Sequence, residues 1–222
     1  MTDSASCAVA LIAQFCAQGV SDLVLSPGSR SAPLALAAVA AEARGELRLH
    51  VRVDERSAGF LALGLAKGSR RCVPVVTTSG TAVGNLLPAV MEAHHAGVPL
   101  LVVSADRPLE LVGFGVNQTT DQRGLFDSFV RYRAQVEASA SPISWPAQAA
   151  RAVIAAQGSA SRDPGPAHLN VALTVPLVGA ATPAPPRAHE VVHAGPGPAA
   201  PIRLPAGPRT VVVCGDATPG EG

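Results

Sequence analysis

The 222-residue sequence has almost no net charge, which separates it from several classes of binding protein. The formal net charge is +1, and charged residues make up 15% of the chain. A field this weak attracts neither nucleic acid nor an anionic membrane surface, so we expect neither as a partner. The 48% content of hydrophobic residues is that of an ordinary globular protein with a sizeable core.

Cysteines are few and widely separated. The four, Cys7, Cys16, Cys72 and Cys214, show no CxxC spacing. This excludes a disulfide scaffold and favours a reducing compartment, in which each cysteine acts as a small buried hydrophobe. The apolar N-terminal segment has no lysine or arginine before Arg30 and no run long enough to cross a bilayer. It therefore resembles neither a signal peptide nor an anchor, and we predict a cytoplasmic protein.

The usual nucleotide and metal signatures are also missing. The sequence contains neither GxGxxG nor GxxxxGK[ST], which disfavours a conventional nucleotide site. His94 and His95 are adjacent on an expected helix, so their side chains point in different directions and cannot converge on one ion. We predict no metal ligands in this sequence.

What the sequence does contain is a repeat of short apolar segments, each followed by a longer segment rich in alanine and leucine. The short segments have the length and β-branched content of buried strands, and the long ones end near Gly45, Gly68 and Gly97, as helices often do. Apolar strands joined by helices specify a parallel sheet. We predict an α/β fold with a doubly wound, mostly parallel sheet and helices on both faces.

The repeat ends near residue 178. Residues 146–160 are expected to form another helix and 168–177 a returning strand. Residues 179–209 are rich in proline and alanine and read as a linker. Residues 210–222 begin with a strand-like TVVVCGD, which we interpret as the first strand of a truncated central domain. The predicted organisation is thus a domain over 1–178, a linker, and the start of a second domain.

Ligands of such sheets bind beyond the carboxyl ends of the strands, where this sequence has four loops of small or polar residues. Two of these loops carry Arg30 and Arg107. Guanidinium groups bind carboxylates through paired hydrogen bonds, so the two arginines suit an anionic substrate. Salt bridges to Asp54 or Asp106 are the structural alternative. The polar run 117–120 either supplies orienting donors or caps a helix start.

Glu55 stands at the mouth of an apolar helix. The stretch 58–66, AGFLALGLA, has no polar side chain, which predicts burial on all sides. A carboxylate beside such a surface loses hydration, and its pKa rises towards the range in which it can share a proton. Pairing with Arg52 or Arg56 is the alternative interpretation.

Several sequence blocks together resemble one family. These are PGSRS, DERSAGF, TSGTA, ADRP and NQ, and the likeness covers about residues 5 to 178. They resemble the N-terminal, pyrimidine-binding domain of the 2-succinyl-5-enolpyruvyl-6-hydroxy-3-cyclohexene-1-carboxylate synthases, which are thiamine diphosphate enzymes of menaquinone biosynthesis.

The resemblance implies an enzyme that uses thiamine diphosphate and Mg²⁺ to decarboxylate 2-oxoglutarate and to add the resulting carbanion equivalent to isochorismate. It implies that Glu55 is catalytic: the carboxyl group hydrogen-bonds the cofactor's pyrimidine ring and favours the imino tautomer that removes the thiazolium proton. The other implied positions form two groups. Pro27, Gly28, Thr78, Ser79 and Gly80 would bind the cofactor; Ser29, Arg30, Arg107, Asn117 and Gln118 would bind substrate.

The sequence also departs from the family pattern. The resemblance implies that Mg²⁺ and diphosphate ligands belong to a C-terminal domain, and CGDA at 214–217 lacks the second glycine of the family's Gly-Asp-Gly motif. In the family each active site lies between this domain of one subunit and the C-terminal domain of another, which implies a homodimer or homotetramer. Because we find no C-terminal domain in this sequence, we expect the 222-residue chain to be inactive alone. The alternatives are a free-standing pyrimidine-binding subunit of a 2-oxo acid decarboxylase and a non-catalytic oligomerisation module.

Overall fold

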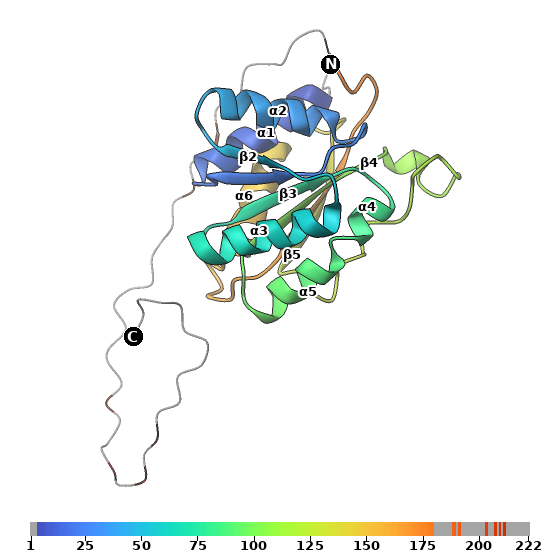
Figure 1. Cartoon of the computed structure of the whole chain (residues 1–222). Coiled ribbons are helices and arrows are strands. Elements are labelled where there is room, and N and C mark those ends of the chain that lie inside the picture. Colours follow the sequence, from blue (N-terminus) through green and yellow to red (C-terminus); the bar gives the residue numbers. More distant parts are fainter. Residues whose placement is uncertain are drawn as a thin grey trace.

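The structure is a computed structural model that describes residues 4–179 and 188–189, together with residues 191, 203, 207, 209 and 211. Residues 4–179 form a single sheet flanked by helices (Figure 1).

The sheet has six strands, all parallel, in the order β2-β1-β3-β4-β6-β5. Their bounds are β1 (Asp22–Leu25), β2 (Arg48–Val51), β3 (Val73–Thr77), β4 (Leu100–Asp106), β5 (Tyr132–Glu137) and β6 (Ala167–Ala172). The chain builds outward from β1 in one direction and from β3 in the other, which is a doubly wound topology. The predicted α/β fold is confirmed.

Helices cover both faces, as predicted (Figure 1). One face carries α1 (Ser4–Ala17), α2 (Ala32–Ala43) and α6 (Ser144–Gln157); the other carries α3 (Glu55–Ser69), α4 (Thr81–Gly84) and α5 (Leu87–His95). A short 3-10 helix, η1 (Leu109–Leu111), follows β4. Alternation along a strand divides the core into two: Leu23 and Leu25 of β1 face the α1 side, and Val24 faces the α3 side. None of the helices described is long and apolar enough to cross a membrane.

Three local predictions need correction. Gly45 and Gly97 do follow their helices in the left-handed conformation, but Gly68 lies inside α3, and Arg70 takes that conformation instead, with φ +57°. The long segment that ends at Gly97 forms two helices rather than one, because the chain turns between α4 and α5. Strand β5 was not predicted, since its sequence YRAQVE belongs to a sheet edge and alternates polar with apolar residues.

Helix α3 is not buried on all sides. Its buried residues are the small ones, Ala58, Gly59, Ala62 and Ala66, and a Cβ added at Gly59 would lie 3.0 Å from the Cβ of Ala89 in α5. The small residues thus allow close packing against the sheet and α5. Leu61, Leu63 and Leu65 are partly buried against the core, whereas Phe60 is 42% exposed. The prediction of all-round burial was wrong, because the side of the helix that carries Phe60 is exposed in the described part of the chain.

The described cysteines behave as expected. Cys7 and Cys72 are fully buried and Cys16 is partly buried, and burial raises the pKa of Cys72 to about 12 and that of Cys16 to about 11. Neither thiol is therefore a ready nucleophile at neutral pH. Cys214 lies outside the described residues.

The predicted linker and second domain lie almost entirely outside the described residues. Within the linker, the backbone N–H of His189 donates to Oε1 of Gln14 at 2.7 Å, and its carbonyl accepts from Nε2 of Gln14 at 3.1 Å. The side chain of Gln14 is fully buried. At this point the segment is fastened to α1 by both groups of one amide.

Candidate functional site

The four predicted loops lie at one edge of the sheet. They follow β1, β2, β3 and β4, and because all the strands are parallel, their carboxyl ends meet on the same side. The loops after β3 and β4 are joined by short hydrogen bonds of Arg107, whereas Glu55, which follows β2, has only one side-chain hydrogen bond, at 3.4 Å, among the described residues.

Two glycines bring backbone segments close together. A Cβ at Gly28 would lie 2.4 Å from the Cβ of Thr78, so the turn after β1 fits directly against the end of β3. Gly80 has φ +80°, and a Cβ there would lie 3.0 Å from Cγ of Gln118 and 3.1 Å from its carbonyl oxygen. Both positions require glycine, one for close approach and one also for its backbone conformation.

Arg107 is a buried cation that has no acidic partner within residues 4–179. Its residue surface is only 7% exposed; Nη1 donates to the carbonyl of Gln118 at 2.8 Å and also to Oγ of Ser79. The Nε of Arg107 is buried and has no hydrogen-bond partner among the described residues. Asp106 does not neutralise the guanidinium by direct pairing, because its Oδ1 accepts the backbone N–H of Arg107 at 2.7 Å.

Arg30 reaches across the same edge. Its Nη1 donates to the carbonyl of Leu173, just beyond β6, at 3.0 Å. Burial and then the positive charge of Arg107 lower the pKa of Arg30. Asp54 instead caps α3, with Oδ2 accepting the N–H of Ser57 at 2.7 Å. In the described part of the chain neither arginine forms an ion pair, so the salt-bridge alternative is not what the structure adopts.

The remaining predicted positions near the two arginines differ in their contacts and exposure. Gln118 packs on the Ser79–Gly80 turn, with Nε2 donating to the carbonyl of Ser79 at 3.0 Å. Pro27 and Ser29 are exposed beside Arg30. Asn117 is exposed, and its carbonyl accepts from Oγ1 of Thr119 at 3.4 Å. No helix begins in the run 117–120, so that alternative is wrong.

Glu55 stands apart from the arginine cluster, the name we use for Arg30 and Arg107 together with Ser79, Gly80 and Gln118. It begins α3 and is half-buried; the amide of Asn85, just after α4, donates to its Oε2 at 3.4 Å. It forms no ion pair with Arg52 or Arg56 among the residues the structure describes. The predicted loss of hydration is only partial in the described residues, because Glu55 is half-buried and the side of α3 that carries Phe60 is exposed.

A buried polar network behind the arginines was not predicted. The side chain of Asn170, in β6, makes four hydrogen bonds: Oδ1 accepts from Gln122 at 2.7 Å and Ser104 at 2.9 Å, and Nδ2 donates to Asp106 at 2.7 Å and Gln135 at 2.8 Å. The sequence signal for this network was weak. It consists of single polar residues within apolar strands, as in HLNVAL and VVSAD, where they interrupt an otherwise hydrophobic run.

His168 extends the network as a neutral group. Burial lowers the pKa of His168 to about 3, with a smaller contribution from the charge of Arg133. Ser104 donates its single proton to Asn170, so its oxygen must accept from Nε2 of His168 at 2.7 Å. The imidazole is therefore neutral and protonated at Nε2. Burial also raises the pKa of Asp106.

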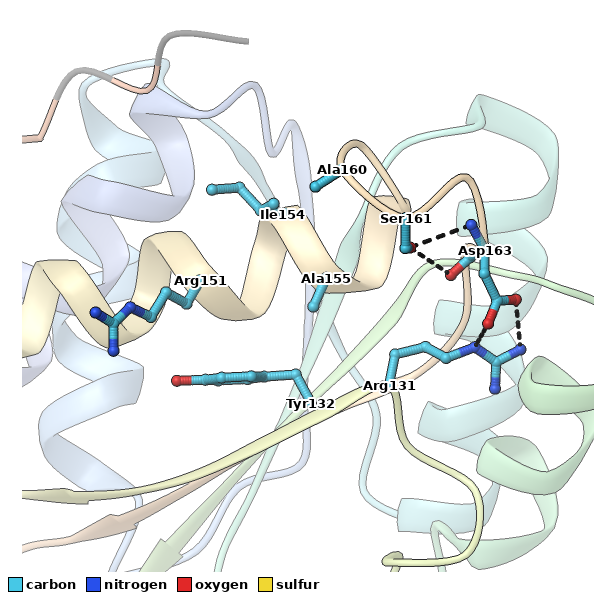
Figure 2. A pocket seen from close by; sticks show the side chains of 8 residues that line it. All are labelled: Arg131, Tyr132, Arg151, Ile154, Ala155, Ala160, Ser161 and Asp163. Carbon is cyan, nitrogen blue, oxygen red and sulfur yellow. Dashed lines mark hydrogen bonds and ion pairs between the residues drawn. The ribbon is translucent and has the colours of Figure 1, made fainter. Parts of the chain in front are cut away.

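A separate cavity of about 420 Å³ lies at the opposite edge of the sheet, near the amino ends of β5 and β6. Figure 2 shows it between α6 and the start of β5, with Arg131 paired to Asp163 on one side and Arg151 on the other side of Tyr132. None of the predicted site residues lines it. The cavity and the arginine cluster are distinct features.

Comparisons with known proteins identify the family to which this chain belongs. Residues 7–126 match the family model described as thiamine pyrophosphate enzyme, N-terminal TPP binding domain, and the chain belongs to this family.

Among curated relatives, the chain is similar to proteins named 2-succinyl-5-enolpyruvyl-6-hydroxy-3-cyclohexene-1-carboxylate synthase. It is 53% identical to that of Kineococcus radiotolerans over 98% of this chain and 40% of the relative. It is 53% identical to that of Paenarthrobacter aurescens, over 90% of this chain and 36% of the relative. The predicted family is confirmed, and the chain spans about two fifths or less of the length of these relatives.

Proposed function

We propose that this chain is the pyrimidine-binding portion of a thiamine diphosphate-dependent synthase that decarboxylates 2-oxoglutarate and joins the product to isochorismate. The observation that carries the proposal is the pair Arg30 and Arg107, two cations at one sheet edge without a carboxylate partner in the described chain. Both substrates carry carboxylates, which are the natural ligands of such a pair.

The charge balance of this edge supports a bound anion. Bringing two guanidinium groups together costs free energy unless a negative charge joins them, and the lowered pKa of Arg30 reflects both burial and that repulsion. The buried Nε of Arg107 is a donor that lacks an acceptor among the residues the structure describes. A substrate carboxylate would satisfy that donor and neutralise part of the charge. Ser29, Asn117 and Gln118 are assigned to orient the rest of the substrate.

The residues present fit a cofactor ring at the same edge. Glycine at positions 28 and 80 adds no side chain to the turns after β1 and β3, and the buried hydroxyls of Ser26 and Thr77 lack partners among the described residues. Pro27, Gly28 and the turn 78–80 are assigned to that ring. Thiamine diphosphate, when bound, supplies the carbon nucleophile that attacks the 2-oxo group.

Glu55 is assigned to hold a proton at a pyrimidine nitrogen of that ring. The loss of hydration that this role needs would come from a surface that covers the outer face of α3, where Phe60 is 42% exposed. We assign that cover to a second polypeptide surface, within a homodimer or homotetramer. No group of three or more potential metal ligands occurs among the described residues, and Mg²⁺ is assigned to the diphosphate-binding part of the longer relatives.

Isothermal titration of the 222-residue chain with 2-oxoglutarate tests the proposal. The wild-type chain should bind it, and Arg107→Met should weaken binding by at least about tenfold, because a charged hydrogen-bond partner is lost. Arg151→Met removes a guanidinium at the opposite edge and is the matched control, which should bind like wild type. Equal affinity in all three chains, or binding of the uncharged dimethyl ester as tightly as the dianion, would refute the assignment.

Turnover provides the second arm of this test. With thiamine diphosphate, Mg²⁺ and both substrates, the 222-residue chain alone should give no product. Product formation by the purified chain would show that no second surface is required.

A further inference from the structure

Gln122 connects the Ser79–Gly80 turn beside Arg107 to the buried network around Asn170. Its side chain is fully buried, although it comes from the largely exposed segment between η1 and β5. Oε1 accepts the backbone N–H of Gly80 at 3.1 Å, and Nε2 donates to the carbonyl of Ala105 at 3.0 Å and to Oδ1 of Asn170 at 2.7 Å. All three partners are buried, and two belong to strands.

The orientation of this amide is fixed by the backbone. The N–H of Gly80 can only donate and the carbonyl of Ala105 can only accept, so the oxygen and nitrogen of Gln122 cannot exchange places. This in turn fixes Asn170, whose oxygen must face Gln122 and whose nitrogen must face Asp106. The network therefore has a single set of donor directions.

The Ser79–Gly80 turn depends on this amide. The turn requires φ +80° at Gly80, and its neighbour Ser79 contacts Nη1 of Arg107. On its other side the turn meets Gln118, which is exposed and lies in the same irregular segment. Gln122 is thus the one described side chain that ties the N–H of Gly80 to strands β4 and β6.

We propose that Gln122 is a positioning residue that locks the Ser79–Gly80 turn, and through it the Arg107 guanidinium, in the geometry that receives a substrate carboxylate. The inference rests on the proposed function for its ligand. Gln122 makes no contact with the reacting atoms in this assignment. It acts through Gly80 and Arg107.

The structure offers a matched control in Gln135. Its Oε1 accepts from Nδ2 of Asn170 at 2.8 Å, so Gln122 and Gln135 both bond the same asparagine, from opposite ends of its amide. Gln135 donates to Glu137 at 2.8 Å, and in the described part of the chain its side chain makes no hydrogen bond with Gly80 or Arg107. Gln122→Met and Gln135→Met remove the same chemical group from the same network, and only the first removes the acceptor for Gly80.

The test compares these variants in the 222-residue chain by titration with 2-oxoglutarate and with the monocarboxylate 2-oxobutanoate. Hydrogen exchange of the Gly80 amide and thermal unfolding are measured in parallel. Gln122→Met should raise the Kd for 2-oxoglutarate at least about tenfold and reduce its preference over the monocarboxylate. It should also speed exchange at Gly80. Gln135→Met should alter neither affinity nor exchange by more than about twofold, whatever its effect on the melting temperature.

Each outcome decides between the two claims. Equal losses of affinity in both variants, or none in either, would overturn the positioning role. If the wild-type chain binds no dianion, the proposed function is wrong, while exchange at Gly80 still decides whether Gln122 holds the turn. Should Gln122→Met fail to fold, Gln122→Asn replaces it, since its shorter side chain cannot reach both Gly80 and Ala105.

Discussion

The carboxyl edge of the sheet has a closed half and an open half. At the ends of β3, β4 and β6, Asn170 is fully hydrogen-bonded, Arg107 is 7% exposed, and Gln122 and Ser79 are fully buried. At the ends of β1 and β2, Glu55 is half-buried, and Val53 and Phe60 are 86% and 42% exposed. Both halves carry predicted site residues.

The difference indicates how much of the site this chain organises by itself. The hydrogen bonds of Asn170 allow one arrangement of the network, so we expect the arginine half to be preorganised for the anion of the proposed function. The half around Glu55 has apolar side chains in solvent and a carboxylate that is still hydrated. We infer that the first half is built within the chain and that the second is completed by another surface.

The largest expected effect comes from breaking the closed half. Asn170→Leu removes four side-chain hydrogen bonds of the buried network, those with Gln122, Ser104, Asp106 and Gln135, and such losses cost about 3–5 kcal/mol of unfolding free energy. Asn85→Leu, the matched change in the open half, removes only the weak 3.4 Å contact with Glu55 and should cost less than about 1 kcal/mol. Urea denaturation measures both. Similar costs for the two variants would remove the distinction between the halves.

Acid should weaken the closed half through His168. Because folding lowers the pKa of His168 from its ordinary 6.5 to about 3, protonation favours the unfolded chain. The stability provided by the neutral imidazole is complete above pH 6.5 and is lost as the pH falls towards 3. Between about pH 7.5 and about pH 5 this amounts to about 2 kcal/mol.

The His168→Gln variant isolates that contribution. Glutamine can still donate to Ser104 but does not titrate, so the difference between wild type and variant should change by about 2 kcal/mol over the interval. Other groups, including Asp106 with its raised pKa, cancel in this difference. A difference that stays constant with pH would mean that His168 is not buried in its neutral form.

The smallest effect on stability is expected in the open half. Phe60→Ser should change the unfolding free energy of the chain by less than about 1 kcal/mol, because the ring is 42% exposed. If the outer face of α3 is an interface, the same variant should shift any dimer towards monomer in light scattering coupled to size exclusion. A variant that assembles like wild type would place the covering surface elsewhere.

The sequence predicted the fold because the repeat of apolar strands and helices carries it. It also predicted Arg30 and Arg107 as a pair, since both follow parallel strands and must lie at one edge. It missed β5, whose polar residues suit a sheet edge, and the network around Asn170, whose members are single residues 64 and 48 positions from Asp106 and Gln122. Periodicity cannot reveal such long-range pairs.

The treatment of α3 shows a different limit. The apolar sequence of α3 predicts burial on all sides. Hydrophobic side chains show only that burial is favourable, and they do not identify the surface that covers them. In this chain the small residues Ala58, Gly59 and Ala62 pack inward and Phe60 remains outside. The same open face explains why Glu55 has not lost its hydration.

The central claim is that Arg30 and Arg107 together receive a carboxylate-bearing substrate, and arginine Nε–H resonances in the ¹H–¹⁵N spectrum of the 222-residue chain test it directly. On titration with 2-oxoglutarate, the signals of these two residues should move together and saturate, while the exposed Arg44 and Arg123 stay in place. If all four move equally and without saturation, as they would with added salt, the anion site does not exist.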